Sequence, residues 1–111
     1  MKKNREIDGY YFRVKRDKLW YNICFTDLTE LEARRQLLGR SNEWLKSLHD
    51  GLYEITKEIL YMILDPEDKL ECTDMLVEIF ELEDVSERII LLYKIIRKLA
   101  VKFDIRGNVD D

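Results

Sequence analysis

Apolar residues recur every three or four positions through most of the chain, which is the spacing of an amphipathic helix. The longest segment with this pattern begins at Ser41, whose side chain can cap a helix, and is stopped by Asp65 and Pro66. Its apolar residues fall on one helical face and are Trp44, Leu48, Leu52, Ile55, Ile59 and Met62. We therefore expect residues 42–64 to form the central helix on which the other elements pack.

Capping signals predict three further helices. Thr29 and Glu32 have the spacing of a capping box, in which the hydroxyl and the carboxylate each accept a bond from a free backbone amide. Asp65, followed by proline, opens the next helix, and Asp84 or Ser86 opens the last. The predicted helices are 30–38, 42–64, 66–82 and 86–104.

Residues 10–25 alternate between apolar and polar with period two around a polar turn, which predicts a β-hairpin. With a two-residue turn at Asp17 and Lys18, one face is wholly apolar, and we expect it to lie on the helices because a lone hairpin is marginal in water. That face comprises Tyr10, Phe12, Val14, Tyr21, Ile23 and Phe25.

The predicted fold class is therefore α+β and mostly helical. An N-terminal β-hairpin packs on a small bundle of about four helices, in the order ββαααα. We expect a single domain over residues 1–106 and a flexible tail at 107–111.

Composition agrees with this fold and narrows the function classes. One Pro and four Gly in 111 residues, with 46% hydrophobic and 38% charged residues, disfavour an all-β fold and extensive disorder. Two cysteines and one histidine do not assemble a disulfide framework or a zinc site, so we expect no metal and no cofactor. The longest unbroken apolar run, Ile59 to Leu64, is too short to cross a membrane, and a cytoplasmic location is expected.

No pattern in the chain indicates catalysis. An enzyme needs a nucleophile beside a base, a pair of tuned carboxylates or a metal cluster. Cys24 and His49 are candidates for a thiol–imidazole pair, but no third residue is placed to orient the histidine. Asp50, Glu54 and Glu58 recur every fourth residue without the Glu-x-x-His ligand pattern, which favours a solvated face. We therefore expect a protein that is not an enzyme.

The N-terminal part of the chain contains the run GYYFRVKRDKLWYNICFTDLTELE, followed by RSNEWLKSL. In this region, residues 4–48, the chain resembles short uncharacterised proteins carried on conjugative and integrative mobile elements of Gram-positive bacteria. Those proteins tend to have glycine after the turn Asp, where this chain has Lys18. The resemblance implies a mobile-element setting and brings no activity or site residue with it.

The second face of the predicted hairpin mixes cations with aromatic rings, as nucleic-acid-binding surfaces do. On it, Lys15 is expected opposite Trp20, and Tyr11 opposite Cys24. This hairpin face is a polar outer surface, a nucleic-acid site, or a site for a protein partner, since Trp, Tyr and Arg commonly anchor interfaces. Its candidate residues are Tyr11, Arg13, Lys15, Arg16, Lys18 and Trp20.

The helix predicted at 66–82 carries carboxylates at spacings of four, three, four and three, which places them in one row. This acidic stripe is Glu67, Glu71, Asp74, Glu78 and Glu81. Like charges one turn apart destabilise an isolated helix by about 0.2–0.5 kcal/mol per pair, and only Lys69 offers relief within the helix. The stripe is either a solvated face, paired or not with Arg97, Lys98 and Lys102, or a ridge that occupies a basic groove of a partner.

The helix predicted at 86–104 has more apolar residues than one face can bury. Its main seam is Val85, Ile89, Leu92, Ile96, Leu99 and Phe103. Outside that seam lie Ile90, Leu91, Tyr93, Ile95 and Val101. This excess predicts a possible homodimer through the helix.

These patterns favour a small, non-enzymatic accessory protein of a mobile element that works by binding a macromolecule, with a protein as the expected partner. In the sharper form of this hypothesis, the acidic stripe occupies the nucleic-acid-binding groove of a target and inhibits or regulates it. The alternative is a nucleic-acid-binding protein that uses the hairpin face.

Overall fold

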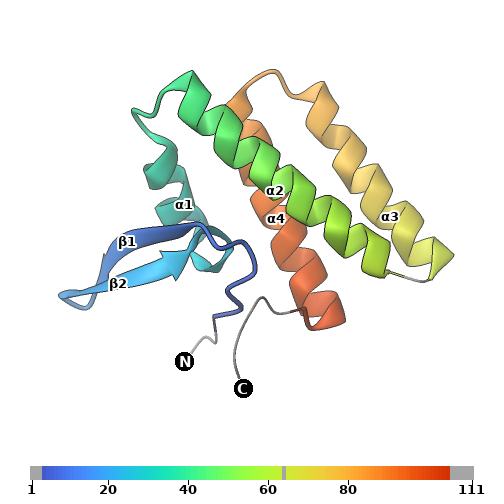
Figure 1. Ribbon diagram of the computed structural model, residues 1–111, viewed down its shortest axis with the longest axis horizontal. Coiled ribbons are helices and arrows are strands. Elements are labelled where there is room, and N and C mark those ends of the chain that lie inside the picture. The colour runs from blue at the N-terminus through green and yellow to red at the C-terminus, as the bar shows by residue number, and fades with distance from the viewer. Residues whose placement is uncertain (1–3, 64, 106–111) are drawn as a thin grey trace.

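A computed structural model describes residues 4–63 and 65–105, and it confirms the α+β, mostly helical fold (Figure 1). The described residues form one antiparallel hairpin followed by four α-helices. The elements are β1 (Tyr11–Arg16), β2 (Leu19–Cys24), α1 (Glu30–Leu37), α2 (Asn42–Met62), α3 (Pro66–Val77) and α4 (Val85–Phe103). Two short 3-10 helices complete them, η1 (Phe25–Asp27) after the hairpin and η2 (Glu78–Glu81) after α3.

Each predicted helix start has the expected cap. The Thr29 hydroxyl accepts from the Glu32 amide at 3.2 Å, while the Thr29 amide donates to the Glu32 carboxylate at 2.9 Å. Ser41 caps α2 and Asp65 caps α3. Of the two candidates for α4 it is Asp84 that caps the helix, accepting from the Ser86 amide at 3.1 Å. Such caps contribute about 1 kcal/mol each, so the helix boundaries follow from local chemistry.

The hairpin has the predicted register and turn. Lys15 pairs with Trp20, and Tyr11 with Cys24. Asp17 and Lys18 form the two-residue turn with φ of 50° and 68°. Positive φ at both positions is the geometry that matches the twist of the strands, and here it is adopted without glycine.

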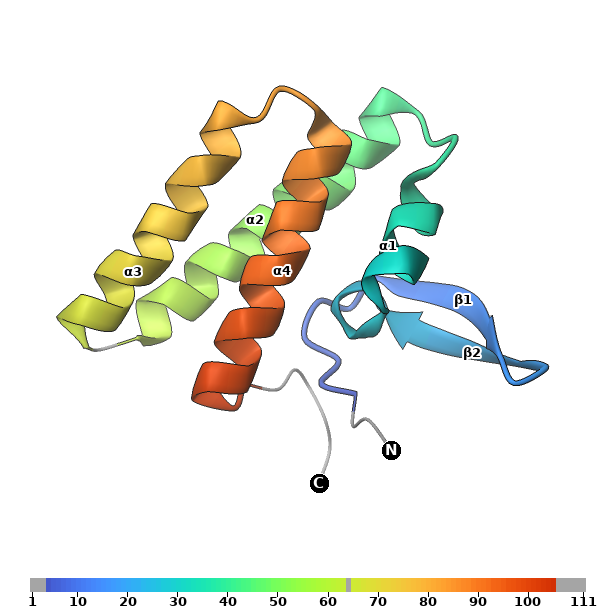
Figure 2. The same cartoon turned by 180° about the vertical axis from the view of Figure 1, so that it is seen from behind.

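The helix at the centre of the fold is α4 and not α2, as Figure 2 shows, with α3 on one side of it and α1 and the hairpin on the other. Eight residues of α4 are buried, against five in the longer α2. The buried residues of α4 are Ile89, Ile90, Leu92, Tyr93, Ile95, Ile96, Leu99 and Ala100. The apolar excess that led us to predict a homodimer is therefore used largely within the chain, and of the five residues outside the seam only Val101 is exposed.

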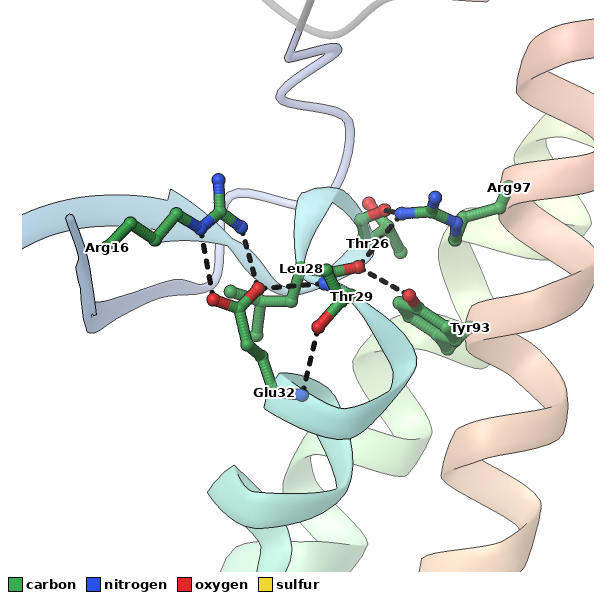
Figure 3. A network of polar contacts seen from close by, with 7 residues as sticks. All are labelled: Arg16, Thr26, Leu28, Thr29, Glu32, Tyr93 and Arg97. Atoms are coloured by element: carbon green, nitrogen blue, oxygen red, sulfur yellow. Dashed lines mark hydrogen bonds and ion pairs between the residues drawn. The ribbon is translucent and has the colours of Figure 1, made fainter. Parts of the chain in front are cut away.

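Polar contacts attach the base of the hairpin to α4 (Figure 3). The Tyr93 hydroxyl donates to the backbone carbonyl of Leu28. The Arg97 guanidinium donates to the carbonyls of Thr26 at 2.8 Å and Leu28 at 2.9 Å. Because η1 and the loop after it have carbonyls that no strand or helix satisfies, these side chains of α4 hold them in place.

The apolar face of the hairpin is only partly buried. Val14, Ile23 and Phe25 are at most 6% exposed, whereas Tyr21 is 43% exposed and Tyr10 is 36% exposed. Our expectation that the whole face lies on the helices is wrong for Tyr21, because the hairpin extends beyond the bundle, as Figure 1 shows. Tyr10, although partly exposed, does lie on α2, where its ring packs against Gly51.

Some predicted bounds shift. The α-helical part of the helix predicted at 66–82 ends at Val77 and continues as η2 to Glu81. Helix α2 ends at Met62, which is 62% exposed and so does not belong to the buried face that we assigned to it. Leu64 and the tail 107–111 lie outside the described residues.

Candidate binding surfaces

The hairpin face keeps three cations and two aromatic rings in one exposed group. The Arg13 guanidinium lies 5.6 Å and the Lys15 ammonium 5.9 Å from the centre of the Trp20 ring. Trp20 is 56% exposed and Tyr11 is 54% exposed. Lys18 is exposed in the turn beside them. The structure thus places five of the six predicted residues of this face at the surface of the hairpin.

Arg16, the sixth predicted residue, does not belong to the hairpin face. Strand alternation directs it toward α1, where it makes two bonds of 3.0 Å and 2.7 Å to the Glu32 carboxylate, as Figure 3 shows. This ion pair lowers the pKa of Glu32 to about 2. Arg16 is therefore a structural residue that ties β1 to α1. We assigned it wrongly because we counted the charges of the hairpin without considering on which face of the strand each side chain lies.

The acidic stripe is divided among three surroundings. Glu71 lies 3.6 Å from the Lys98 ammonium and 3.5 Å from that of Lys102, so it pairs with α4 as one of our alternatives expected. Glu67 and Asp74 are exposed on α3.

Glu78 and Glu81 belong to η2, which winds with three residues per turn and so departs from the row that a continuous α-helix would make. They line a groove of about 490 Å³ together with Arg34 and Lys94. The prediction of five carboxylates in one straight row is wrong because the α-helix stops at Val77.

The sequence did not direct attention to an exposed apolar band beside these carboxylates. Leu70 is 64% exposed, Val77 is 51% exposed and Phe80 is 62% exposed. Leu70 and Val77 are two turns apart on α3 and therefore share a side of the helix, and the Phe80 ring in η2 packs edge-on against Tyr53 of α2. We call Leu70, Val77 and Phe80 the α3 apolar band. The sequence shows that these residues are apolar, but periodicity does not reveal that α3 is an outer helix.

Cys24 and His49 are the two residues considered as a thiol–imidazole pair. His49 interacts with Asp50 at 3.1 Å and stacks on Tyr53, with ring centres 6.2 Å apart. Cys24 is buried beneath Tyr11, and burial raises the pKa of its thiol. No contact between these two residues is found in the described part of the chain. A buried thiol with a raised pKa is a poor nucleophile.

The segment before the hairpin is fixed by two aspartates that the sequence analysis did not single out. Asp8 is 8% exposed, and its carboxylate accepts from the Thr26 amide at 2.8 Å, the Thr26 hydroxyl at 2.6 Å and the Tyr10 amide at 2.7 Å. Asp27 accepts from the backbone amides of Arg5 and Glu6. Burial raises the pKa of Asp8 in spite of these bonds. The only available signal was a lone Asp ahead of a glycine, which is too common to predict a buried carboxylate.

The described residues hold neither a metal-binding cluster nor a membrane-spanning helix. No group of three or more His, Cys, Asp or Glu side chains in residues 4–63 and 65–105 is arranged to hold a metal ion. No helix in that same part of the chain is both long enough and apolar enough to cross a bilayer.

Comparison with known proteins gives no family for this chain. No protein-family model, no curated protein and no solved structure matches it.

Proposed function

We propose that this protein is a non-enzymatic accessory protein that binds a protein partner through the outer surface of α3 and η2. The supporting observation is the α3 apolar band, Leu70, Val77 and Phe80, which is more than half exposed at each position. Apolar residues two turns apart on an outer helix are what a partner groove takes up when it binds a helix. A cytoplasmic location and a mobile-element setting belong to the same proposal.

The charges around the band specify the partner further. Glu67 and Asp74 are exposed on α3, and Glu78 and Glu81 follow on η2. Glu71 is already neutralised by Lys98 and Lys102. The partner therefore has an apolar groove with a basic rim, so that the band supplies the buried contacts and the carboxylates steer the encounter.

Site-specific cross-linking tests the location of the partner site. A benzophenone amino acid in place of Val77 on α3 should capture the partner in cells, and the same group in place of Lys46 on α2 should not, although both positions are exposed. Capture from Lys46 alone would contradict the proposal.

Affinity for the purified partner then tests the contacts. The variant Leu70→Gln/Val77→Gln should bind at least about tenfold more weakly, because it replaces apolar side chains at the centre of the interface with polar amides. Asp74→Asn/Glu78→Gln should weaken binding at low salt and lose most of that effect as salt rises, because added ions screen the same contacts. The charge-matched control is Glu43→Gln/Glu58→Gln, two exposed carboxylates of α2, which should bind as the parent does. Equal affinity of all these proteins would remove α3 from the mechanism.

A further inference from the structure

A second surface, at the opposite end of the molecule from α3, combines cations and aromatic rings around a groove. The groove has a volume of about 640 Å³ and lies between the start of β1 and the corner where α1 leads into α2. Its lining includes Tyr10, Tyr11, Arg13, Gln36, Arg40 and Trp44. Arg13 and Tyr11 belong also to the hairpin face, so the groove and that face form one continuous surface.

The cations of this surface are held over aromatic rings and not against carboxylates. The Arg40 guanidinium lies 4.3 Å from the centre of the Trp44 ring, and its Nε donates to the Gln36 carbonyl at 3.0 Å. Arg13 and Lys15 lie over Trp20 in the same way. In the described residues, none of these three cations forms an ion pair.

Many of the cations elsewhere in the described chain are neutralised by carboxylates. Those that form ion pairs are Arg5, Arg16, Arg34, Lys57, Lys94, Lys98 and Lys102, whereas Arg35, Lys46, Lys69, Arg88 and Arg97 form none within the described residues but do not gather with exposed aromatic rings in one group. Although the whole chain has a net charge of -4, the groove and hairpin face therefore carry a local positive charge that the protein does not neutralise. Among the described residues, two carboxylates contact residues of this surface: Glu6 accepts a weak bond of 3.5 Å from the Tyr11 hydroxyl, and the buried Asp8 accepts from the Tyr10 amide at 2.7 Å.

We propose that this surface, Arg13, Lys15 and Arg40 with Tyr11 and Trp20, binds single-stranded nucleic acid. The three cations pair with backbone phosphates, and the two exposed rings stack on bases. Stacking needs free base faces, which a single strand offers and a duplex hides. An acidic peptide would satisfy the cations but leaves no role for rings that are more than half exposed.

The phenol of Tyr11 can donate a hydrogen bond to a phosphate. Like any tyrosine with an ordinary pKa near 10 it is neutral at neutral pH, and the side chain of Cys24 is the first cause that raises its pKa further, to about 12.

A direct binding experiment tests the proposal with the whole protein. The probe is a fluorescein-labelled thymidine oligonucleotide of about 15 nucleotides, a length within the range that small single-strand-binding domains occupy. We expect saturable binding at low salt with quenching of tryptophan fluorescence, because the chain has two tryptophans and both lie on this surface. A duplex of the same length should bind at least tenfold more weakly, and polyglutamate should not compete.

Variants separate the phosphate contacts from stacking. Arg13→Gln/Arg40→Gln should reduce the slope of log affinity against log salt by about 1.4, since each lost phosphate contact on a single strand contributes about 0.7. Trp20→Ala should weaken binding roughly 5- to 150-fold, and the folded far-ultraviolet spectrum should be retained because the ring is 56% exposed. The control Lys46→Gln/Lys69→Gln makes the same change in charge; Lys46 lies on the side of α2 away from Trp44, and Lys69 lies on α3. It should bind as the parent does.

Several results would overturn the proposal. They are an absence of binding at low salt, equal affinity for the duplex, equal competition by polyglutamate, and an equal loss in the control variant. The outcome is distinguishable from that for the α3 surface, because Leu70→Gln/Val77→Gln should bind the oligonucleotide as tightly as the parent does.

Discussion

Helices α3 and α4 are both rich in apolar residues, but the fold uses them in opposite ways. In α4 eight residues are buried, whereas in α3 only Cys72 and Leu76 are buried and Leu70 and Val77 remain exposed. The difference is one of position, since α4 is covered by α2, α1 and η1 while α3 lies at the edge of the bundle (Figure 2). Apolar excess in a sequence therefore indicates an uncovered surface only when the helix is an outer one.

The largest expected effect comes from truncating one apolar residue in each helix. Ile96→Ala in α4 should lower the free energy of unfolding by about 2–5 kcal/mol, because Ile96 is 0% exposed and its removal leaves a cavity. Val77→Ala in α3 should change it by less than about 0.5 kcal/mol, because Val77 is 51% exposed. Urea unfolding of both variants measures the contrast, and equal losses would contradict it.

A somewhat smaller effect concerns the cover that η1 provides over α4. Asp8→Asn keeps one acceptor oxygen and places an amide donor against the Thr26 donors, so a buried bond is lost. We expect a loss of about 1–3 kcal/mol in the free energy of unfolding, measured by thermal denaturation. Asp74→Asn, at an exposed position on α3, is the control and should melt with the parent. If the two variants melt together, Asp8 does not hold η1 on α4.

The ion pair between Arg16 and Glu32 holds the hairpin to α1, which also packs on α4, and acid titration measures what this pair contributes to stability. Because Arg16 lowers the pKa of Glu32 from its ordinary 4.5 to about 2, the stability from this pair is complete above pH 4.5 and is lost as the pH falls through 2. Between pH 4.5 and pH 2 the free energy of unfolding of Glu32→Gln should fall by roughly 1 kcal/mol less than that of the parent. The difference is no larger because solvent screens part of the ion pair.

Urea midpoints at pH 5 and pH 3 measure this difference. Asp8 cannot mimic it: burial raises its pKa, so the stability it contributes falls as the pH rises from its ordinary 3.8 through the raised value. A parent and a Glu32→Gln variant with the same acid sensitivity would show that the ion pair does not stabilise the fold.

The smallest expected effect is on self-association. Val101 is 71% exposed and is the residue of α4 that the predicted homodimer would still have available outside the seam. With so little apolar surface uncovered on α4, we expect Val101→Glu to leave the sedimentation coefficient unchanged from low to high micromolar concentration. A parent dimer that this substitution dissociates would restore the prediction of a homodimer through the helix.

The parts of the fold that could be predicted are those with local signals. Thr29 with Glu32, Ser41, Asp65 and Asp84 sit within one helical turn of the amides they cap, so spacing alone identifies them. The register of the hairpin follows from its two-residue turn in the same way.

The parts that could not be predicted depend on residues far apart in the chain. Arg97 appeared to be a partner for the acidic stripe, yet it bonds carbonyls of Thr26 and Leu28, about seventy positions earlier. No proline or glycine marks the change from α3 to η2 at Val77, so the stripe looked straight. The hairpin face was found from alternation and charge, but Arg40 and Trp44 joined it only once the fold had brought α2 beside β1.

The central position of α4 has a consequence for synthesis. Phe25 and Leu28 are 0% exposed in the finished fold; the Phe25 ring packs against Tyr93, and the Leu28 carbonyl accepts from the Tyr93 hydroxyl. On the ribosome, the hairpin, α1 and α2 emerge before α4 does. The side chains of Phe25 and Leu28 therefore stay exposed to water until α4, which buries them, has been translated. A nascent chain released before Val85 has no central helix to pack on and is left to chaperones and proteases.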